Sequence, residues 1–204
     1  MRIAVIGAGN VGGTLGRRWA TLGHTVAFGV RRPAKGQTTP SEAARGAELV
    51  LFAIPWNAVP EALAELGADG GALDGVVLVD ATNPLGPGLK LLTGPQGESG
   101  GERLQALVPR ARVVKAFNTT GYENMASPAY GGEPTAMFYA GDDSAAKETV
   151  RGLIVQLGFE PIDAGPLARS RELEHLAALW VALAMGVGTA RLGRDIAFRL
   201  MRRP

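Results

Sequence analysis

Cysteine is absent from the 204 residues of the chain, and histidine occurs only twice. Without cysteine the chain can form no disulfide framework, no thiolate metal site and no thiol nucleophile. We also find no cluster of histidine and carboxylate residues with the spacing of metal ligands, so we expect no bound metal. The chain begins with a strand-like run instead of a secretion signal. These features predict a cytoplasmic protein.

An excess of one charge and a long apolar run are also missing. The 21 basic and 19 acidic residues leave a net charge of only +2. Arginines gather near the C-terminus without interleaved aromatic residues, so we expect no nucleic-acid partner. The longest apolar stretch, at 176–188, is shorter than the roughly 20 residues of a membrane span, so we expect a buried helix and no membrane partner. The hydrophobic content of 46% suffices for one core with a small appendage.

Strand-like runs alternate with helical patterns along most of the chain. The strand-like runs lie at 2–6, 25–29, 48–54, 76–80, 112–117, 135–140 and 159–163, and helical patterns lie at 10–22, 40–45, 57–66 and 144–157. The glycine-rich and proline-rich stretch 84–101 and the stretch 118–134 read as long loops. Alternation of this kind predicts an α/β fold with a doubly wound, mainly parallel sheet.

The first strand runs into a glycine pattern, Gly7, Gly9 and Gly12, with the spacing Gly-x-Gly-x-x-Gly. In such a turn the first glycine permits the tight bend, the second lets the backbone approach a pyrophosphate, and the third lets the next helix pack closely. A helix that includes Asn10 and Val11 would point its free N–H groups at the phosphates. Although 29 glycines make a chance match possible, the position between strand and helix favours a dinucleotide site.

The second strand ends in Val30, Arg31 and Arg32. NAD enzymes place an acidic residue near this point to hold the ribose 2′-hydroxyl. Arginine instead suits the 2′-phosphate of NADP, because a guanidinium binds phosphate with two donors in a fixed fork. Lys35 could join this group, and the alternative is that the arginines are solvated surface charges. We predict NADP(H) as the cofactor, in a Rossmann-type domain over residues 1–165 followed by a small C-terminal helical segment over 166–204.

Three later strands end in residues that would also line the cofactor. Ala53, Ile54 and Pro55 follow the third strand and would contact the cofactor through backbone groups, although Pro55 could also begin a helix. Asn83 and Asn118 follow the next two strands. Their amides could bond to the nicotinamide carboxamide, but asparagines in turns often bond their own backbone instead.

Proton-transfer groups are few near these strand ends. Lys115, Asp80 and Tyr122 are the candidates. The sequence shows no Ser-Tyr-Lys set with helical spacing, and no histidine pairs with an Asp or Glu in an obvious site. The catalytic residues therefore stay unassigned.

The C-terminal part is predicted to be helical, with a helix over 169–184 that is apolar on nearly every side and a short arginine-rich helix over 193–203. A helix that is apolar all round cannot lie on the surface of a monomer. We therefore predict a homodimer with Trp180 at the centre of its interface.

The chain resembles the NADPH-dependent reductases of the deazaflavin coenzyme F420. The segments that carry the resemblance span nearly the whole chain, at 7–12, 20–24, 29–32, 54–56, 141–143, 163–167, 170–171 and 174. It implies a Rossmann domain with a small helical part, a dimer, and Arg31 and Arg32 on the phosphate of NADP. It places the deazaflavin against the nicotinamide, beside the loops after Asn83 and Asn118. Residues 118–121 depart from the family pattern, so a flavin or another acceptor is an alternative, and the cytosolic domains of transmembrane ferric reductases are similar too.

The resemblance implies direct hydride transfer between NADP(H) and a small-molecule redox substrate. Such transfer needs close alignment of two rings and no acid or base. One alternative is an imine or carbonyl reductase resembling pyrroline-carboxylate reductase, in which Lys115 or Tyr122 would donate a proton. Another is a non-catalytic NADPH sensor, in which Phe117, Met125 and Tyr130 would fill the pocket beside the nicotinamide.

Overall fold

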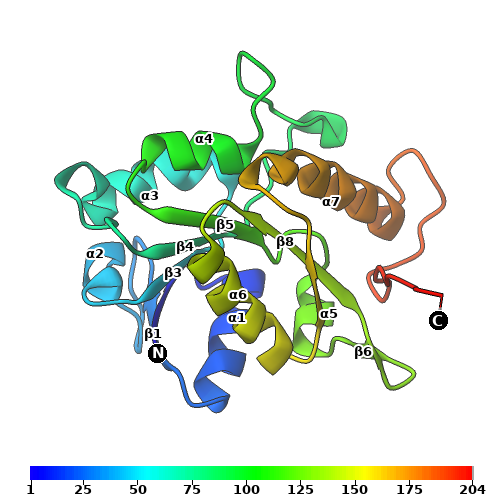
Figure 1. Ribbon diagram of the computed structural model, residues 1–204, viewed down its shortest axis with the longest axis horizontal. Helices are drawn as coiled ribbons and strands as arrows, with labels where there is room; N and C mark the ends of the chain where they lie inside the picture. The colour runs from blue at the N-terminus through cyan, green and yellow to red at the C-terminus, as the bar shows by residue number, and fades with distance from the viewer. Residues whose placement is uncertain (204) are drawn as a thin grey trace.

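A seven-stranded sheet forms the centre of the computed structural model, which describes residues 1–203 (Figure 1). The strand order is β2-β1-β3-β4-β5-β8-β9. The strands are β1 (Arg2–Ile6), β2 (Thr25–Gly29), β3 (Leu49–Phe52), β4 (Val77–Asp80), β5 (Arg112–Ala116), β8 (Ala136–Gly141) and β9 (Glu160–Asp163). The first five are parallel to one another, whereas β8 is antiparallel to β5 and parallel to β9. The Rossmann-type fold and the mainly parallel sheet are confirmed.

Helices cover both faces of the sheet (Figure 1). The helices are α1 (Asn10–Thr21), α2 (Pro40–Ala44), α3 (Val59–Leu66), α4 (Gly100–Leu107), α5 (Tyr122–Ala126), α6 (Ser144–Gln156) and α7 (Ser170–Met185). One core cluster joins α1, α5 and α6 to the sheet, and a second joins α2, α3 and α4 to the other face. Strands β3 and β4 are buried along their whole length, as expected for parallel strands covered on both faces.

Two helices were not predicted: α4 begins in the last two residues of the predicted loop 84–101 and continues into residues without an assigned element, and α5 lies inside the predicted loop 118–134. Helix α4 begins at Gly100 behind a capping box, in which the hydroxyl of Ser99 accepts from the backbone N–H of Glu102 and the Glu102 carboxylate accepts from that of Ser99. Helix α5 lies within 118–134 and is followed by a small hairpin of β6 (Ala129–Tyr130) and β7 (Glu133–Pro134). Both predicted loops are therefore only partly irregular.

The helix predicted over 193–203 is wrong, because these residues form a tail without regular structure. The carbonyl groups of the tail bond to other parts of the chain instead of to their own helix. Ala136 donates its N–H to the Phe198 carbonyl at 2.9 Å, and Asn124 donates its side-chain amide to the Ile196 carbonyl at 2.6 Å. The tail thus lies along β8 and α5.

The same tail covers Trp180 of α7. The Trp180 indole donates to the Ile196 carbonyl at 2.8 Å, and the Arg194 guanidinium lies 5.6 Å from the centre of a Trp180 ring. Only 4% of Trp180 is exposed, so the expectation that this residue presents an open dimer surface is wrong. Leu179 and Met185 are the large apolar residues of α7 that stay exposed. Within residues 1–203 no helix is long and apolar enough to cross a membrane.

Candidate functional site

The candidate site lies where β1, β2 and β3 end, at the carboxyl edge of the parallel strands, which is where open α/β sheets bind ligands. Gly7 follows β1 with a φ of +100°, and a Cβ there would lie 2.5 Å from the Ala53 carbonyl oxygen. A Cβ at Gly12 would clash with the Gly7 carbonyl oxygen. The fold itself therefore requires both glycines. At Gly9, in contrast, a Cβ would meet no protein atom within 4 Å.

Helix α1 begins directly after Gly9, with Asn10 and Val11 in its first turn. No side chain caps this end, and its first turn carries no acidic residue. The first N–H groups of a helix have no partner inside the helix, and the helix dipole adds partial positive charge there. Gly9 thus has free space around it and is followed by the uncapped N-terminus of a 12-residue helix. Such a helix end can bind an anionic group such as a pyrophosphate.

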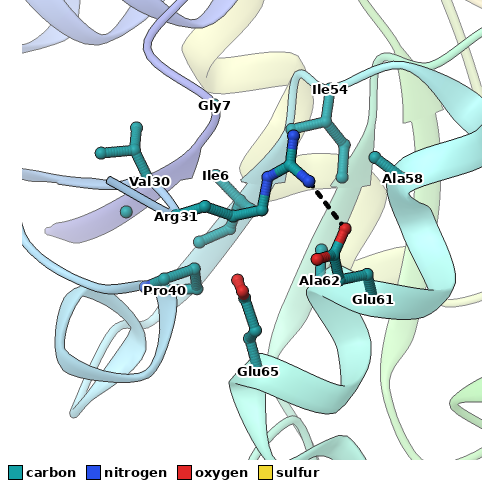
Figure 2. Close-up of a pocket in the computed structure, with 11 residues that line it drawn as sticks. Ile6, Gly7, Val30, Arg31, Pro40, Ile54, Ala58, Glu61, Ala62 and Glu65 are labelled. Atoms are coloured by element: carbon teal, nitrogen blue, oxygen red, sulfur yellow. Dashed lines mark hydrogen bonds and ion pairs between the residues drawn. The ribbon is translucent and has the colours of Figure 1, made fainter. Parts of the chain in front are cut away.

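A cavity of about 200 Å³ lies beside this turn, between the strand ends and helices α2 and α3 (Figure 2). Its apolar walls come from the strand ends and from helices α2 and α3, and its charged side chains, which are exposed, stand at the rim. The apolar lining residues are Ile6, Val30, Pro40, Ile54, Ala58 and Ala62, and the charged ones are Arg31, Glu61 and Glu65. Apolar walls with a charged rim suit a flat ring that carries polar substituents.

A second, wider cavity of about 590 Å³ adjoins the first and is lined by Arg31, Arg32, Glu61 and Glu65. Arg31 reaches across from the end of β2 to α3, where its Nη1 pairs with the Glu61 Oε2 at 2.9 Å (Figure 2). Both side chains are more than half exposed. The structure thus brings Arg31 and Arg32 to one site, whereas Lys35 lies in an exposed loop and lines neither cavity.

The residues after β3 contribute in different ways. Ile54 lines the cavity, and Ala53 packs against the glycine turn. Pro55 precedes a short 3-10 turn at Trp56–Ala58, which leads into α3. Ile54 and Ala58 of this segment line the cavity, whereas Pro55 itself lies just before the 3-10 turn and lines neither cavity.

The two asparagines after β4 and β5 bond to each other. The Asn118 amide donates to the Asn83 Oδ1 at 3.0 Å and to the Leu173 carbonyl at 3.2 Å, and the Asn83 amide donates to the Asn118 carbonyl at 2.9 Å. The side-chain oxygen of Asn118 is buried and accepts no hydrogen bond from the described residues. This pair ties two strand ends together, and the enclosed oxygen of Asn118 is an acceptor without a donor in the unliganded protein.

Lys115 and Asp80, the proton-transfer candidates, form a buried ion cluster with Glu174 of α7. The Lys115 ammonium donates to the Asp80 Oδ2 at 3.0 Å, the Glu174 Oε1 at 2.9 Å and the Thr82 carbonyl at 2.7 Å. Lys115 and Asp80 are completely buried. Burial disfavours the charged form of Lys115, but the carboxylates of Asp80 and Glu174 outweigh that effect and raise its pKa.

This geometry disfavours Lys115 as a proton donor. An ammonium has three N–H donors, and all three are engaged here. Glu174 also accepts from the backbone N–H groups of Gly100 and Gly101, at 3.1 and 3.2 Å. The cluster therefore connects β4, β5, α4 and α7. Sequence reasoning missed this role of Glu174, although a lysine inside the apolar run of β5, in register with Asp80, was a signal for a buried pair.

The three side chains considered as a plug for a sensor do not gather in one place. Phe117 and Met125 belong to the core, where the Phe117 ring meets Trp19 edge-on at 5.7 Å. Tyr130 lies on the small hairpin, is 39% exposed and donates to the Asn124 side-chain oxygen at 2.6 Å. This arrangement does not favour the sensor interpretation. Tyr122 is half-buried, with the Arg194 guanidinium 5.2 Å from the centre of its ring.

Comparison with known proteins adds the family. Residues 2–84 match the family described as NADP oxidoreductase, coenzyme F420-dependent. The crystal structure of an Arthrobacter sp. FB24 protein, provisionally assigned as an F420-dependent NADP-reductase, is 34% identical and has a TM-score of 0.86. That match covers 99% of this chain and 100% of the other. The chain belongs to the coenzyme F420-dependent NADP oxidoreductase family. The resemblance read from the sequence is confirmed, and so is the expectation of an NADP-dependent oxidoreductase.

Two further relatives extend the comparison of this family member. A hypothetical protein of Sinorhizobium meliloti is 26% identical, with a TM-score of 0.74 over 100% of this chain and 96% of that one. The Metalloreductase STEAP3 of Rattus norvegicus is 30% identical in an alignment 184 positions long that covers 86% of this chain. The matched part is 36% of that relative, so the chain spans about a third of its length.

Proposed function

We propose that the chain transfers hydride between NADP(H) and a deazaflavin such as coenzyme F420, or a flavin-like acceptor. The observation that carries the proposal is that Arg31 lines both the apolar cavity beside the glycine turn and the adjoining cavity that Arg32 also lines. Family membership supports the same chemistry.

The residues of the site fit the parts of NADP one after another. The adenine would occupy the apolar cavity beside Ile54, and its 2′-phosphate would meet Arg31 and Arg32 in the adjoining cavity. The pyrophosphate would lie over Gly9 and the uncapped end of α1, against the N–H groups of Asn10 and Val11. The nicotinamide would then reach the ends of β4 and β5, beside the asparagine pair, where the enclosed side-chain oxygen of Asn118 would need a shift of the side chain to accept from a carboxamide N–H.

The described groups near the ends of β4 and β5 match a reaction without proton transfer. Bound NADPH supplies a hydride from its nicotinamide ring, and the protein has to align that ring with the acceptor ring and exclude water. The Lys115 cluster and the asparagine pair hold the ends of β4 and β5 in fixed positions for this alignment. An imine or carbonyl reductase stays a second candidate only through Tyr122, since Lys115 has no donor left for a substrate.

Two further parts of the proposal concern the setting of the reaction. We place the protein in the cytoplasm, where its lack of cysteine matches a reducing environment. We also propose a homodimer, which would cover Leu179 and Met185 of α7, two large side chains that are nearly half exposed.

Replacing both Arg31 and Arg32 by alanine is expected to weaken NADPH binding about tenfold to a hundredfold, the effect of losing charge-assisted hydrogen bonds to a phosphate. NADH binding should change little, because NADH has no 2′-phosphate. Calorimetric titration with both cofactors measures the two effects. Arg45→Ala, an exposed arginine outside both cavities, is the control and should bind NADPH normally. Equal losses for NADPH and NADH would contradict the placement of the phosphate.

A further inference from the structure

The wider cavity beside the proposed adenosine site contains as many acidic as basic side chains. Arg31 and Arg32 face Glu61 and Glu65, and these four residues are its whole lining. The site that would receive a phosphate therefore has no formal excess of positive charge. A 2′-phosphate adds negative charge beside two carboxylates, which opposes the attraction of the arginines.

Helix α3 places both carboxylates on the side that faces the cavities. Glu61 and Glu65 are four residues apart and therefore lie on one face of α3 together with Ala62, and Ala58, directly before the helix, lines the same cavity (Figure 2). The two alanines leave room for a ligand, so the glutamates are the only charged groups that α3 contributes to this wall.

Glu61 is already bound to the guanidinium that the phosphate needs. The Arg31 Nη1 donates to the Glu61 Oε2 at 2.9 Å, and this contact draws the arginine across the cavity toward α3 (Figure 2). A phosphate binds arginine best through two parallel N–H groups. It must therefore displace or share the Glu61 carboxylate, and the pair is exposed enough for this exchange to occur.

We infer that Glu61 is a specificity-determining residue that lowers the preference for NADPH over NADH by competing with the 2′-phosphate for Arg31. The inference rests on the proposed binding of NADP(H) at this site. The two arginines would then differ in how readily they bind the phosphate. Arg31 is paired with Glu61, whereas Arg32 makes no ion pair with any described residue.

Removing the carboxylate should release Arg31 to the phosphate. Glu61→Gln keeps the size of the side chain, and we expect it to lower the Kd for NADPH about twofold to fivefold, the upper part of the range of an exposed ion pair. The Kd for NADH should change less than twofold. Asp69→Asn removes one exposed negative charge just beyond α3, outside both cavities, and should change neither Kd.

A double-mutant cycle shows whether Glu61 acts through Arg31. The gain for NADPH should disappear when Glu61→Gln is made in an Arg31→Ala background. Calorimetric titration of the wild type, both single variants and the double variant with NADPH and NADH provides the data. A gain that persists without Arg31, or NADPH binding that Glu61→Gln leaves unchanged, would overturn the inference while the proposed function stands. Failure of every form, wild type included, to bind NADPH would overturn both.

Discussion

The Gly9→Val variant is expected to fold normally and to bind both NADPH and NADH at least about a hundredfold more weakly, because several charge-assisted contacts to the pyrophosphate would be lost together. Gly9 differs from Gly7 and Gly12 in the space around it, because a side chain at either of those two glycines would clash with the protein itself. A Cβ at Gly9 meets no protein atom within 4 Å, so valine finds space in the unliganded protein and occupies the place proposed for the pyrophosphate.

The control for this variant is Gly70→Val, because a Cβ at Gly70 also meets nothing within 4 Å and that glycine lies outside both cavities. Thermal unfolding followed by circular dichroism should give both variants a Tm close to that of the wild type. Calorimetry should then show normal NADPH binding for Gly70→Val alone. A folded Gly9→Val protein that binds NADPH like the wild type would place the dinucleotide elsewhere.

Lys115→Met is expected to lower the free energy of unfolding by about 3–5 kcal/mol, the usual effect of removing one partner from a buried ion pair. The variant leaves the carboxylates of Asp80 and Glu174 facing each other without a cation in a site that excludes water. Urea unfolding measures the change. Lys147→Met removes a partly exposed lysine that pairs with Asp163, and should cost less than about 1 kcal/mol.

A second variant keeps this prediction testable if Lys115→Met does not fold. Neutralising the whole cluster, with Asp80→Asn and Glu174→Gln added to Lys115→Met, removes the unpaired charges and should recover part of the lost stability. Equal stability of the wild type and Lys115→Met would contradict the account of the cluster. A triple variant that is less stable than Lys115→Met would contradict it as well.

The sequence predicts the sheet well because burial on both faces gives parallel strands nearly continuous apolar runs. The predictions from the sequence are wrong where contacts with residues far along the chain decide the local structure. Helix α4 begins with two glycines, which favour a loop, but Ser99 and Glu102 cap it and Glu174 accepts from its first N–H groups. The Ser-x-x-Glu spacing was a readable signal, whereas a contact with a residue more than 70 positions away was not.

For the C-terminal tail, the sequence predicted a helix that the structure does not have. Its arginine-rich pattern reads as an exposed helix, yet the tail is held by single contacts to distant residues. Arg194 pairs with Glu123, and Arg199 pairs with Glu133 at 2.7 Å. These partners lie far from residues 193–203 in the sequence, so the local residue pattern could not indicate them. It therefore could not predict that the tail covers Trp180.

For the site, the glycine turn and the arginine pair were readable because each belongs to a short motif with a fixed position after a strand. The acidic residues of α3 were not, since Glu61 and Glu65 look like the solvated face of an ordinary amphipathic helix. Only the fold shows that this face borders both cavities. The asparagine pair lies between these cases: each residue was predicted from its strand end, but not their mutual hydrogen bonds.

The most direct test of the central claim follows the hydride itself. Purified protein is mixed with NADPH that carries two deuterium atoms at C4 of the nicotinamide, so that hydride from either face delivers the label, together with oxidised coenzyme F420 or, separately, a free flavin. With coenzyme F420 we expect NADPH oxidation with deuterium retained on the carbon of the deazaflavin ring that accepts the hydride, detected by mass spectrometry. A flavin accepts hydride on a nitrogen, which exchanges the label with water, so for the flavin the readout is NADPH oxidation alone. Turnover with either acceptor should be greatly reduced in Gly9→Val. No oxidation of NADPH with any of these acceptors, or oxidation by coenzyme F420 without transfer of the label, would contradict the claim.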